Sequence, residues 1–325
     1  MSGNLTLHPW NVGFEWHESG SLAKVLSSAE VSSFNNEGFV ILRAALPVEE
    51  VTRAREATDL ADRAREEELA EGGGRSGISE KGAITFSIHL VAEKEVLRKF
   101  AKHDAFVSLA VDLVGPDVNL YWDQAVYKKP EKPRRFPWHQ DNGYTFVTPQ
   151  QYLTCWVPLV EATLENGCPQ LAPGLHRLGT LEHTWVDPLG WQCFGDPPGS
   201  VITAAVVPGD VVVFSSLAPH LTGPNLTDDV RKAYILQYAP VGAAVLKGDP
   251  LQGEPTGREL CNNAAYQLQL HVAVGRRKQS GGWTGHRSCV YEAGGPRNTN
   301  RMPSRPTAGG AVGDYAERRS APWSK

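Results

Sequence analysis

The sequence predicts a mainly β protein with helices ahead of its strands, on three observations. Residues 118–246 are short segments of β-forming residues separated by Gly, Pro and Asn turns, which is typical of an antiparallel sandwich or barrel. Residues 47–71 are rich in Ala, Glu and Arg, which favours a long helix. The chain has 325 residues, 41% of them hydrophobic and 21% charged, so it is long enough to bury a sizeable core.

The first helix and strand are expected between Ser28 and Leu42. Ser residues precede an Ala-Glu-Val run, Val31 and Phe34 lie at helical spacing, and Gly38 ends the pattern. The apolar run 39–42 then favours a buried strand.

Two further helices are expected before the strand-rich region. The segment 47–71 opens with Pro and early glutamates, which suit the first turn of a helix. The run 72–77, GGGRSG, ends this helix and begins a flexible loop. The segment 72–82 is a candidate lid, with a passive connector as the alternative. A shorter helix is expected over 96–114.

Composition excludes several classes of protein. The net charge of −4 and pI near 6.2 give no global reason to expect a nucleic-acid partner. No apolar run approaches the length of a membrane span, and the first residues do not resemble a signal peptide. Five cysteines without CxxC spacing favour reduced thiols. We therefore expect a cytoplasmic protein with no membrane partner.

The end of the chain differs in composition from the rest. Residues 275–325 are rich in Gly, Pro, Ser and Arg. This composition favours an extension that packs loosely or wraps the surface, with an arm that binds a polyanion as the alternative.

A metal site is indicated by the stretch FPWHQDNGY, residues 136–144. His139 and Asp141 lie two residues apart, so in a strand they would point to the same side and could share one ion. Non-haem Fe(II) sites that activate O₂ use two imidazoles and one carboxylate. His220 follows the strongest strand pattern in the chain and is the candidate third ligand.

An arginine eleven residues after His220 points to a carboxylate co-substrate. Arg231 shares strand parity with Ala233, Ile235 and Gln237, a mostly apolar and therefore interior face. A lone Arg is usually a surface or salt-bridge residue. Together with His-x-Asp and the distant His, it favours a dicarboxylate such as 2-oxoglutarate, because the guanidinium binds a carboxylate through two parallel hydrogen bonds.

With these motifs the chain resembles the phytanoyl-CoA dioxygenase family of Fe(II)/2-oxoglutarate oxygenases. The resemblance spans residues 28–240, and its stretches occur in family order: EVSSFNNEGFVILRAAL (30–46), DQAVYKKP (123–130), WHQDNGY (138–144), LTCWVPLVEATLENGCPQLAPGLHRLG (153–179) and GDVVVFSSLAPHLTGPNLTDDVRKAYILQY (209–238). It implies a double-stranded β-helix core, also called a jelly-roll or cupin-like core, over about 118–246. Helices over about 28–115 would flank this core in a single dioxygenase domain, 1–274.

The resemblance also implies a role for each matching residue. The iron ligands would be His139, Asp141 and His220, and Arg231 would bind the C5 carboxylate of 2-oxoglutarate; Gln124, Thr222, Trp156 and Thr154 would contact this co-substrate. Gln124 shares parity with Leu120, Trp122 and Val126, so it also points inward on our own interpretation. The alternatives are that Trp156 is plain core, Thr154 a plain strand residue and Thr222 a turn residue.

The implied reaction is the oxidation, most simply the hydroxylation, of an unactivated C–H bond of a small-molecule substrate. 2-Oxoglutarate and O₂ become succinate and CO₂. Asp141 favours hydroxylation or another oxidation, such as desaturation or ring closure, because related halogenases have a small residue there. A metal-dependent hydrolase and a non-catalytic cupin-like binding protein are the alternatives. A hydrolase has no need of Arg231, and a binding protein is expected to have lost a ligand.

Substrate contacts are expected near the metal loop, which we define as residues 138–144. Gln140, Asn142 and Tyr144 flank the metal ligands, and Gln237 can face the cavity. These groups would hydrogen-bond a polar substrate or only hold the loop. The basic run 128–135 would guide an anionic substrate or form a solvated loop.

Overall fold

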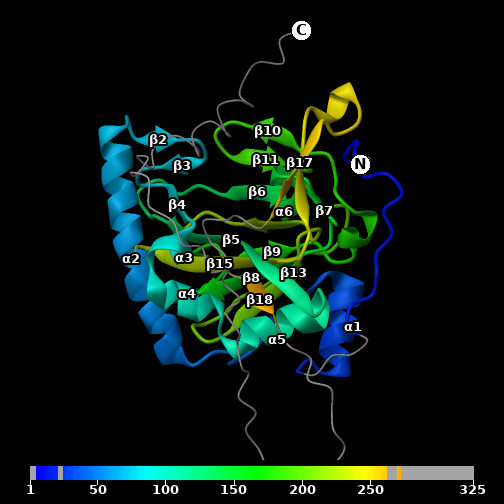
Figure 1. The fold of residues 1–325 in the computed structure, drawn as a ribbon. Helices are drawn as coiled ribbons and strands as arrows, with labels where there is room; N and C mark the ends of the chain where they lie inside the picture. Colours follow the sequence, from blue (N-terminus) through cyan, green and yellow to red (C-terminus); the bar gives the residue numbers. More distant parts are fainter. Residues whose placement is uncertain (1–4, 21–24, 262–268, 272–325) are drawn as a thin grey trace, which may run out of the picture.

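The fold is described from a computed structural model, for residues 5–20, 25–261 and 269–271 (Figure 1). The proposed extension 275–325 lies outside these residues. Among the helices within these ranges, none combines the length and the apolar character needed to cross a bilayer.

The helices precede the β core, apart from single turns within it. They are α1 (Ser28–Glu37), α2 (Val48–Glu71), α3 (Leu90–Glu93), α4 (Glu95–Ala101), α5 (Asp104–Leu113) and α6 (Asp141–Tyr144), with 3₁₀ turns at Leu175–Leu178 and Pro250–Gln252.

The strands form a large sheet, a smaller sheet and two minor ribbons. In chain order they are β1 (Phe39–Leu42), β2 (Arg75–Ser76), β3 (Ser79–Glu80), β4 (Ile84–Ile88), β5 (Asp117–Lys128), β6 (Phe136–His139), β7 (Val147–Thr148), β8 (Leu153–Pro158), β9 (Pro169–Leu171), β10 (Thr184–Val186), β11 (Gly190–Gln192), β12 (Ile202–Thr203), β13 (Val211–Ser215), β14 (His220–Thr222), β15 (Arg231–Pro240), β16 (Ala244–Lys247), β17 (Gly257–Leu260) and β18 (Gln269–His271).

The two principal sheets are antiparallel and lie face to face. The large sheet has the order β1-β13-β8-β15-β5-β4-β3-β2, with β18 also beside β5, and the small sheet has the order β12-β9-β14-β6. Strands that are neighbours in space are distant in the chain; β14, for example, lies between β6 and β9. This is the double-stranded β-helix, or cupin-like jelly roll, that the resemblance implied.

The large sheet separates two hydrophobic clusters. Its outer face packs against α2, α4 and α5, through residues such as Leu97, Phe106 and Tyr234. Its inner face packs against the small sheet, through residues such as Phe136, Trp156 and Phe214. The polar residues of the candidate site lie in this inner layer, between the large and the small sheet.

The N-terminal elements largely confirm the sequence interpretation. The side chain of Ser27 accepts a hydrogen bond from the backbone of Glu30, and the Glu30 carboxylate accepts one from Ser27, a capping box that starts α1. Gly38, at φ 90°, ends this helix in the left-handed conformation that glycine adopts most readily.

Three local expectations differ from the structure. The single helix over 96–114 is two helices, α4 and α5, because His103 caps a new helix by accepting a hydrogen bond from Ala105. The loop 72–82 contains the β2–β3 hairpin, which pairs with β4. Leu120 does not share the face of Gln124: a β-bulge opposite Gln237 and Tyr238 turns it to the helix side.

Candidate metal centre and co-substrate pocket

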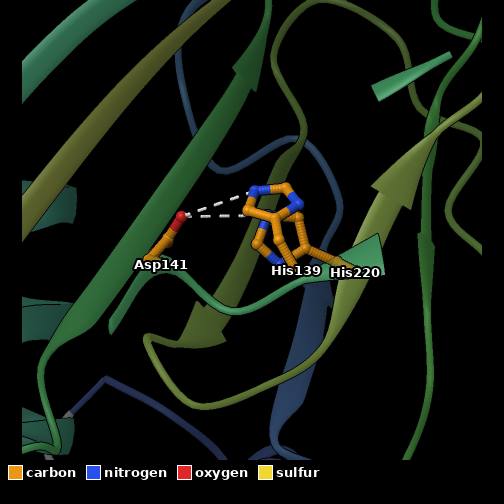
Figure 2. A group of neighbouring side chains, drawn as sticks. All are labelled: His139, Asp141 and His220. Carbon is orange, nitrogen blue, oxygen red and sulfur yellow. Dashed lines mark ion pairs between the residues drawn. The ribbon is translucent and has the colours of Figure 1, made fainter. Parts of the chain in front are cut away.

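Three side chains converge between the sheets to form a metal-binding group. His139 ends β6 and His220 begins β14, and these two residues are direct partners in the antiparallel pair. Asp141 begins α6, two residues after His139, and the Nε2 atoms of both imidazoles lie 3.9 Å from its Oδ1 (Figure 2). One donor atom from each residue lies within 4.8 Å of the others, so the three can hold one ion.

His139 and Asp141 do not lie on one strand, contrary to the expectation from their spacing. The strand ends at His139, and Asp141 is the first residue of the one-turn helix α6, not a strand residue. Alternation along a strand therefore does not bring the two side chains together. The turn after Gln140 does so instead, by folding the carboxylate back toward the imidazoles.

The backbone orients both imidazoles for metal binding. Nδ1 of His139 lies 2.8 Å from the carbonyl of Pro137, and Nδ1 of His220 lies 3.0 Å from the carbonyl of Ala218. Since only a protonated nitrogen can donate to a carbonyl, each Nε2 keeps a lone pair that points toward Asp141. Burial and the nearby His220 hold the pKa of His139 well below its ordinary value, which favours the neutral, ligating form.

A short polar chain orients the carboxylate. The hydroxyl of Thr154 on β8 donates a 2.5 Å hydrogen bond to Oδ2 of Asp141, and Nε2 of Gln237 lies 3.3 Å from the same hydroxyl. Oδ1 thus remains the oxygen that faces the histidines. Thr154, predicted at the co-substrate, instead contacts a metal-ligand candidate, and Gln237 supports it.

Gln140 and Asn142 hold the metal loop from within. The amide nitrogen of Gln140 donates to the carbonyls of Gly179 and Leu217, and its oxygen accepts from the backbone of Leu181. Asn142 donates to Thr180 and accepts from the backbone of Val147; both side chains are fully buried. This geometry favours the loop-holding alternative over substrate contact.

Tyr144 lies at the edge of the same interior. Its ring is stacked near Phe136 and meets the ring of His139 edge-on, with centroids 5.8 and 5.3 Å apart. Its hydroxyl accepts a 3.1 Å hydrogen bond from the backbone of Trp191 in β11. The predicted residue therefore joins the metal loop to the β10–β11 hairpin.

Arg231 is a buried cation, and most of its N–H donors have no hydrogen-bond acceptor among the described residues. It lies on the inner face of β15 and is 1% exposed. One nitrogen contacts the carbonyl of Val126 at 3.4 Å, whereas Nε and Nη2 have no partner within the described part of the chain. Burial lowers the pKa of Arg231 to about 9, which still leaves it charged at neutral pH. Such orphaned donors are costly unless a ligand accepts from them.

Of the remaining predicted residues, Trp156 lies beside this cation. The guanidinium carbon of Arg231 lies 5.4 Å from the centroid of the Trp156 ring. Thr222 is buried at the end of β14. Gln124 lies opposite Ile235, and its amide oxygen accepts from Trp122, which leaves the amide nitrogen to donate elsewhere.

Two buried residues were not singled out from the sequence. Nε2 of His183 accepts the backbone N–H of Gln140 at 2.9 Å, next to the metal ligands. Lys128 lies opposite Arg231 on β5. Its inward parity with Gln124 and Val126 was the signal that could have revealed it.

Comparison with known proteins gives the same family as the motifs. The family model described as phytanoyl-CoA dioxygenase (PhyH) matches residues 34–233. A probable phytanoyl-CoA dioxygenase of Caenorhabditis elegans is 28% identical over 240 residues, 66% of this chain and 76% of the relative. An ectoine dioxygenase of Bordetella parapertussis is 25% identical, over 67% of this chain and 77% of the relative.

A solved structure has the same fold. The structure of EvdO2 from Micromonospora carbonacea var. aurantiaca, complexed with 2-oxoglutarate, is 25% identical with a TM-score of 0.55 and covers 72% of this chain and 98% of its own.

The jelly-roll fold and the His–Asp–His group together define a non-haem iron oxygenase of the class that uses 2-oxoglutarate. Within that class, the chain belongs to the phytanoyl-CoA dioxygenase family.

Proposed function

We propose that this protein hydroxylates an unactivated C–H bond of a small-molecule substrate. The observation that carries the proposal is the pairing, in one interior, of an oriented His–Asp–His group with a buried arginine whose Nε and Nη2 lack partners among the described residues. The first group suits iron, and the second suits the far carboxylate of 2-oxoglutarate.

In this proposal each residue has a defined task. Nε2 of His139, Nε2 of His220 and Oδ1 of Asp141 would hold Fe(II), with Thr154 fixing the carboxylate. Bound Fe(II) and 2-oxoglutarate supply the oxidising chemistry with O₂ that amino-acid side chains lack.

Arg231 would bind the C5 carboxylate, and its place beside Trp156 supports that residue as a neighbour of the co-substrate. Thr222, buried at the end of β14, would contact the co-substrate as well. Gln124 would donate its amide hydrogen to the co-substrate from the opposite strand. The apolar rings of Phe136 and Phe214, 4.6 and 4.5 Å from the two ligand imidazoles, would limit water at the metal.

The overall reaction balances as R–H plus 2-oxoglutarate plus O₂ giving R–OH, succinate and CO₂. One oxygen atom enters the substrate and the other enters succinate. The two electrons that complete the reduction of O₂ come from the oxidative decarboxylation of 2-oxoglutarate, so no further reductant is needed.

The two alternative functions account for fewer observations. A metal-dependent hydrolase would use the triad but leaves the buried, unpartnered donors of Arg231 without a purpose. A binding protein without activity does not require the orientation of His139, His220 and Asp141 by separate hydrogen bonds.

We also propose that residues 1–274 form one catalytic domain and that the protein acts in the cytoplasm. The free thiols of Cys155, Cys168, Cys193 and Cys261 support this location, because reduced cysteines are typical of that compartment.

The test is succinate release by the purified protein with Fe(II), 2-oxoglutarate and O₂, screened over acyl-CoA, amino-acid and natural-product panels. We expect turnover with at least one substrate class, and its loss in His139→Ala and Asp141→Ala. Turnover that persists at the wild-type rate in both variants would rule out this site. Metal-dependent hydrolysis without succinate would favour the hydrolase.

A further inference from the structure

Lys128 is a second buried cation in the interior that holds Arg231. It ends β5, is 1% exposed, and is the direct antiparallel partner of Arg231 on β15. It also pairs with Ile84 of β4, so it lies in the middle of the large sheet rather than at an edge. In the sequence it begins the basic run 128–135, expected to guide an anionic substrate or to form a solvated loop, and its burial excludes a solvated position for this residue.

The ammonium group of Lys128 is held by backbone carbonyls alone. Nζ lies 2.8 Å from the carbonyl oxygen of Thr222 and 3.2 Å from that of Arg134, and it also donates to the carbonyl of Gly223. Three acceptors match the three hydrogens of a charged ammonium. Burial and the neighbouring Arg231 and Arg134 lower the pKa of Lys128. The three carbonyl acceptors act in the opposite direction, because hydrogen bonds to the ammonium stabilise the charged form.

These contacts connect Lys128 to the candidate site. Thr222 and Gly223 are the second and third residues after His220, so Lys128 holds the chain just beyond a metal-ligand candidate. The same contacts fix the backbone that carries the Thr222 hydroxyl. Because all three hydrogens are used, Lys128 acts through this backbone and through its charge rather than by touching a ligand.

The pairing of Lys128 with Arg231 is unfavourable by itself. Like charges directly opposite each other in a sheet repel, and burial removes the water that would screen them. Within the described residues neither cation forms an ion pair with a carboxylate. An anion that binds beside these two positive charges would therefore offset their repulsion.

We propose that Lys128 is a positioning residue that, together with Arg231, makes this pocket select a dicarboxylate co-substrate over a monocarboxylate. Lys128 clamps the Thr222–Gly223 backbone and adds positive potential at the end of the pocket away from the metal. The inference rests on the proposed function, because it assumes that 2-oxoglutarate enters this interior.

The test compares two ligands that differ only at the far end. 2-Oxopentanoate has a methyl group where 2-oxoglutarate has its C5 carboxylate. Dissociation constants for both are measured by calorimetry on Mn(II)-loaded protein without O₂, so that no turnover is needed. The ratio of the two constants reports selectivity for the distal carboxylate.

The variants separate charge from structure. Lys128→Met removes the charge and every donor, whereas Lys128→Gln keeps two N–H donors for the carbonyls and so preserves folding. Lys129→Met is the matched control: Lys129 is the next residue and is also buried, but it pairs with Asp62 of α2 on the helix side of the sheet. Lys129→Met therefore also removes a buried ammonium group next to the end of β5, but one that does not face the site.

We expect both Lys128 variants to weaken 2-oxoglutarate binding about tenfold or more, with 2-oxopentanoate binding nearly unchanged. Lys129→Met should keep the wild-type ratio. The inference is wrong if either folded Lys128 variant keeps the wild-type ratio, or if both ligands weaken equally, which a purely structural role predicts. If the wild type itself binds both ligands alike, the proposed function fails instead.

Discussion

Thr154 donates its hydrogen bond to the oxygen of Asp141 that faces away from the two histidines. The contact is 2.5 Å long and ends on Oδ2, whereas Oδ1 faces His139 and His220. One oxygen is therefore used for orientation and the other is left for the metal. Partners of this kind fix the direction of a ligand and raise metal affinity.

Replacing Thr154 by Val should weaken metal binding while preserving the fold. Val has nearly the same shape but no hydroxyl, so the Asp141 carboxylate loses its orientation. We expect the affinity for Fe(II) or Mn(II) to fall about 10- to 100-fold, measured by calorimetry. Thr154→Ser, which keeps the hydroxyl, should retain most of the affinity. Equal affinities in the wild type and Thr154→Val would mean that the hydrogen bond has no role in metal binding.

Replacing Arg231 by Met should act on the co-substrate rather than on the metal. The variant removes the donors that have no partner among the described residues and leaves an apolar chain of similar length. We expect the KM for 2-oxoglutarate to rise about 100-fold, in the range for loss of one member of a buried charge pair.

Arg231→Lys is the graded comparison for this prediction. It keeps the charge but loses the planar fork, so its KM should lie between those of the wild type and Arg231→Met. Metal affinity without 2-oxoglutarate should be the same in all three proteins. A KM that does not change in Arg231→Met would move the co-substrate carboxylate elsewhere.

The sequence predicted the parts of the site that depend on residue type and strand order. His139, Asp141 and His220 were found because two imidazoles and one carboxylate are the donor set that suits iron, and the structure brings them together. The co-substrate role of Arg231 stays a prediction. Strand alternation placed Arg231 on the inner face, where it lies. The β core and the first helices followed from turn residues, β-forming runs and a Ser cap.

The remaining features depend on contacts that no local pattern encodes. The bulge in β5 reversed the face of Leu120, because one unpaired residue shifts every position beyond it. The Gln140 amide nitrogen donates to carbonyls 39 and 77 positions away, and Lys128 donates to the carbonyl of Thr222, 94 positions away. Only the fold shows that these partners are backbone carbonyls.

Gly143 is the point where the metal loop has no room for a side chain. A Cβ added there would lie 2.0 Å from Cε1 of His183, whose Nε2 accepts the backbone N–H of Gln140. We expect Gly143→Ala to displace this imidazole and the turn between the two ligands. The free energy of unfolding should fall by about 1–3 kcal/mol, and metal affinity should fall with it, measured by denaturation and calorimetry.

Gly195→Ala is the control for this substitution. A Cβ at Gly195 meets nothing within 4 Å, and its backbone does not require glycine. The control should therefore match the wild type in both measurements. A Gly143→Ala protein that behaves like the control would show that the loop can relax around His183 without moving the ligands.

Asp123 gives the fold a pH dependence that is independent of the metal. Its carboxylate is buried under the large sheet and accepts hydrogen bonds from the Tyr234 hydroxyl and the backbone of Val91. Burial raises the pKa of Asp123 to about 6, against these hydrogen bonds, which lower it. The protonated form is therefore favoured in the folded protein relative to the unfolded chain.

The sign of the effect follows from the two pKa values of Asp123. A group whose pKa is higher in the folded protein stabilises it fully below the unfolded value, near 3.8, and loses that contribution as pH rises through about 6. The unfolding free energy of the wild type minus that of Asp123→Asn should therefore fall by about 2 kcal/mol between pH 4 and 7. Urea denaturation at successive pH values measures this difference. Asp210→Asn should show a change of the opposite sign, and only below about pH 4, because the backbone hydrogen bonds from Ala44 and Val207 and the Arg43 guanidinium lower the pKa of Asp210 from 3.8 despite its burial. A difference that stays constant from pH 4 to 7 for Asp123→Asn would show that the carboxylate titrates alike in both states.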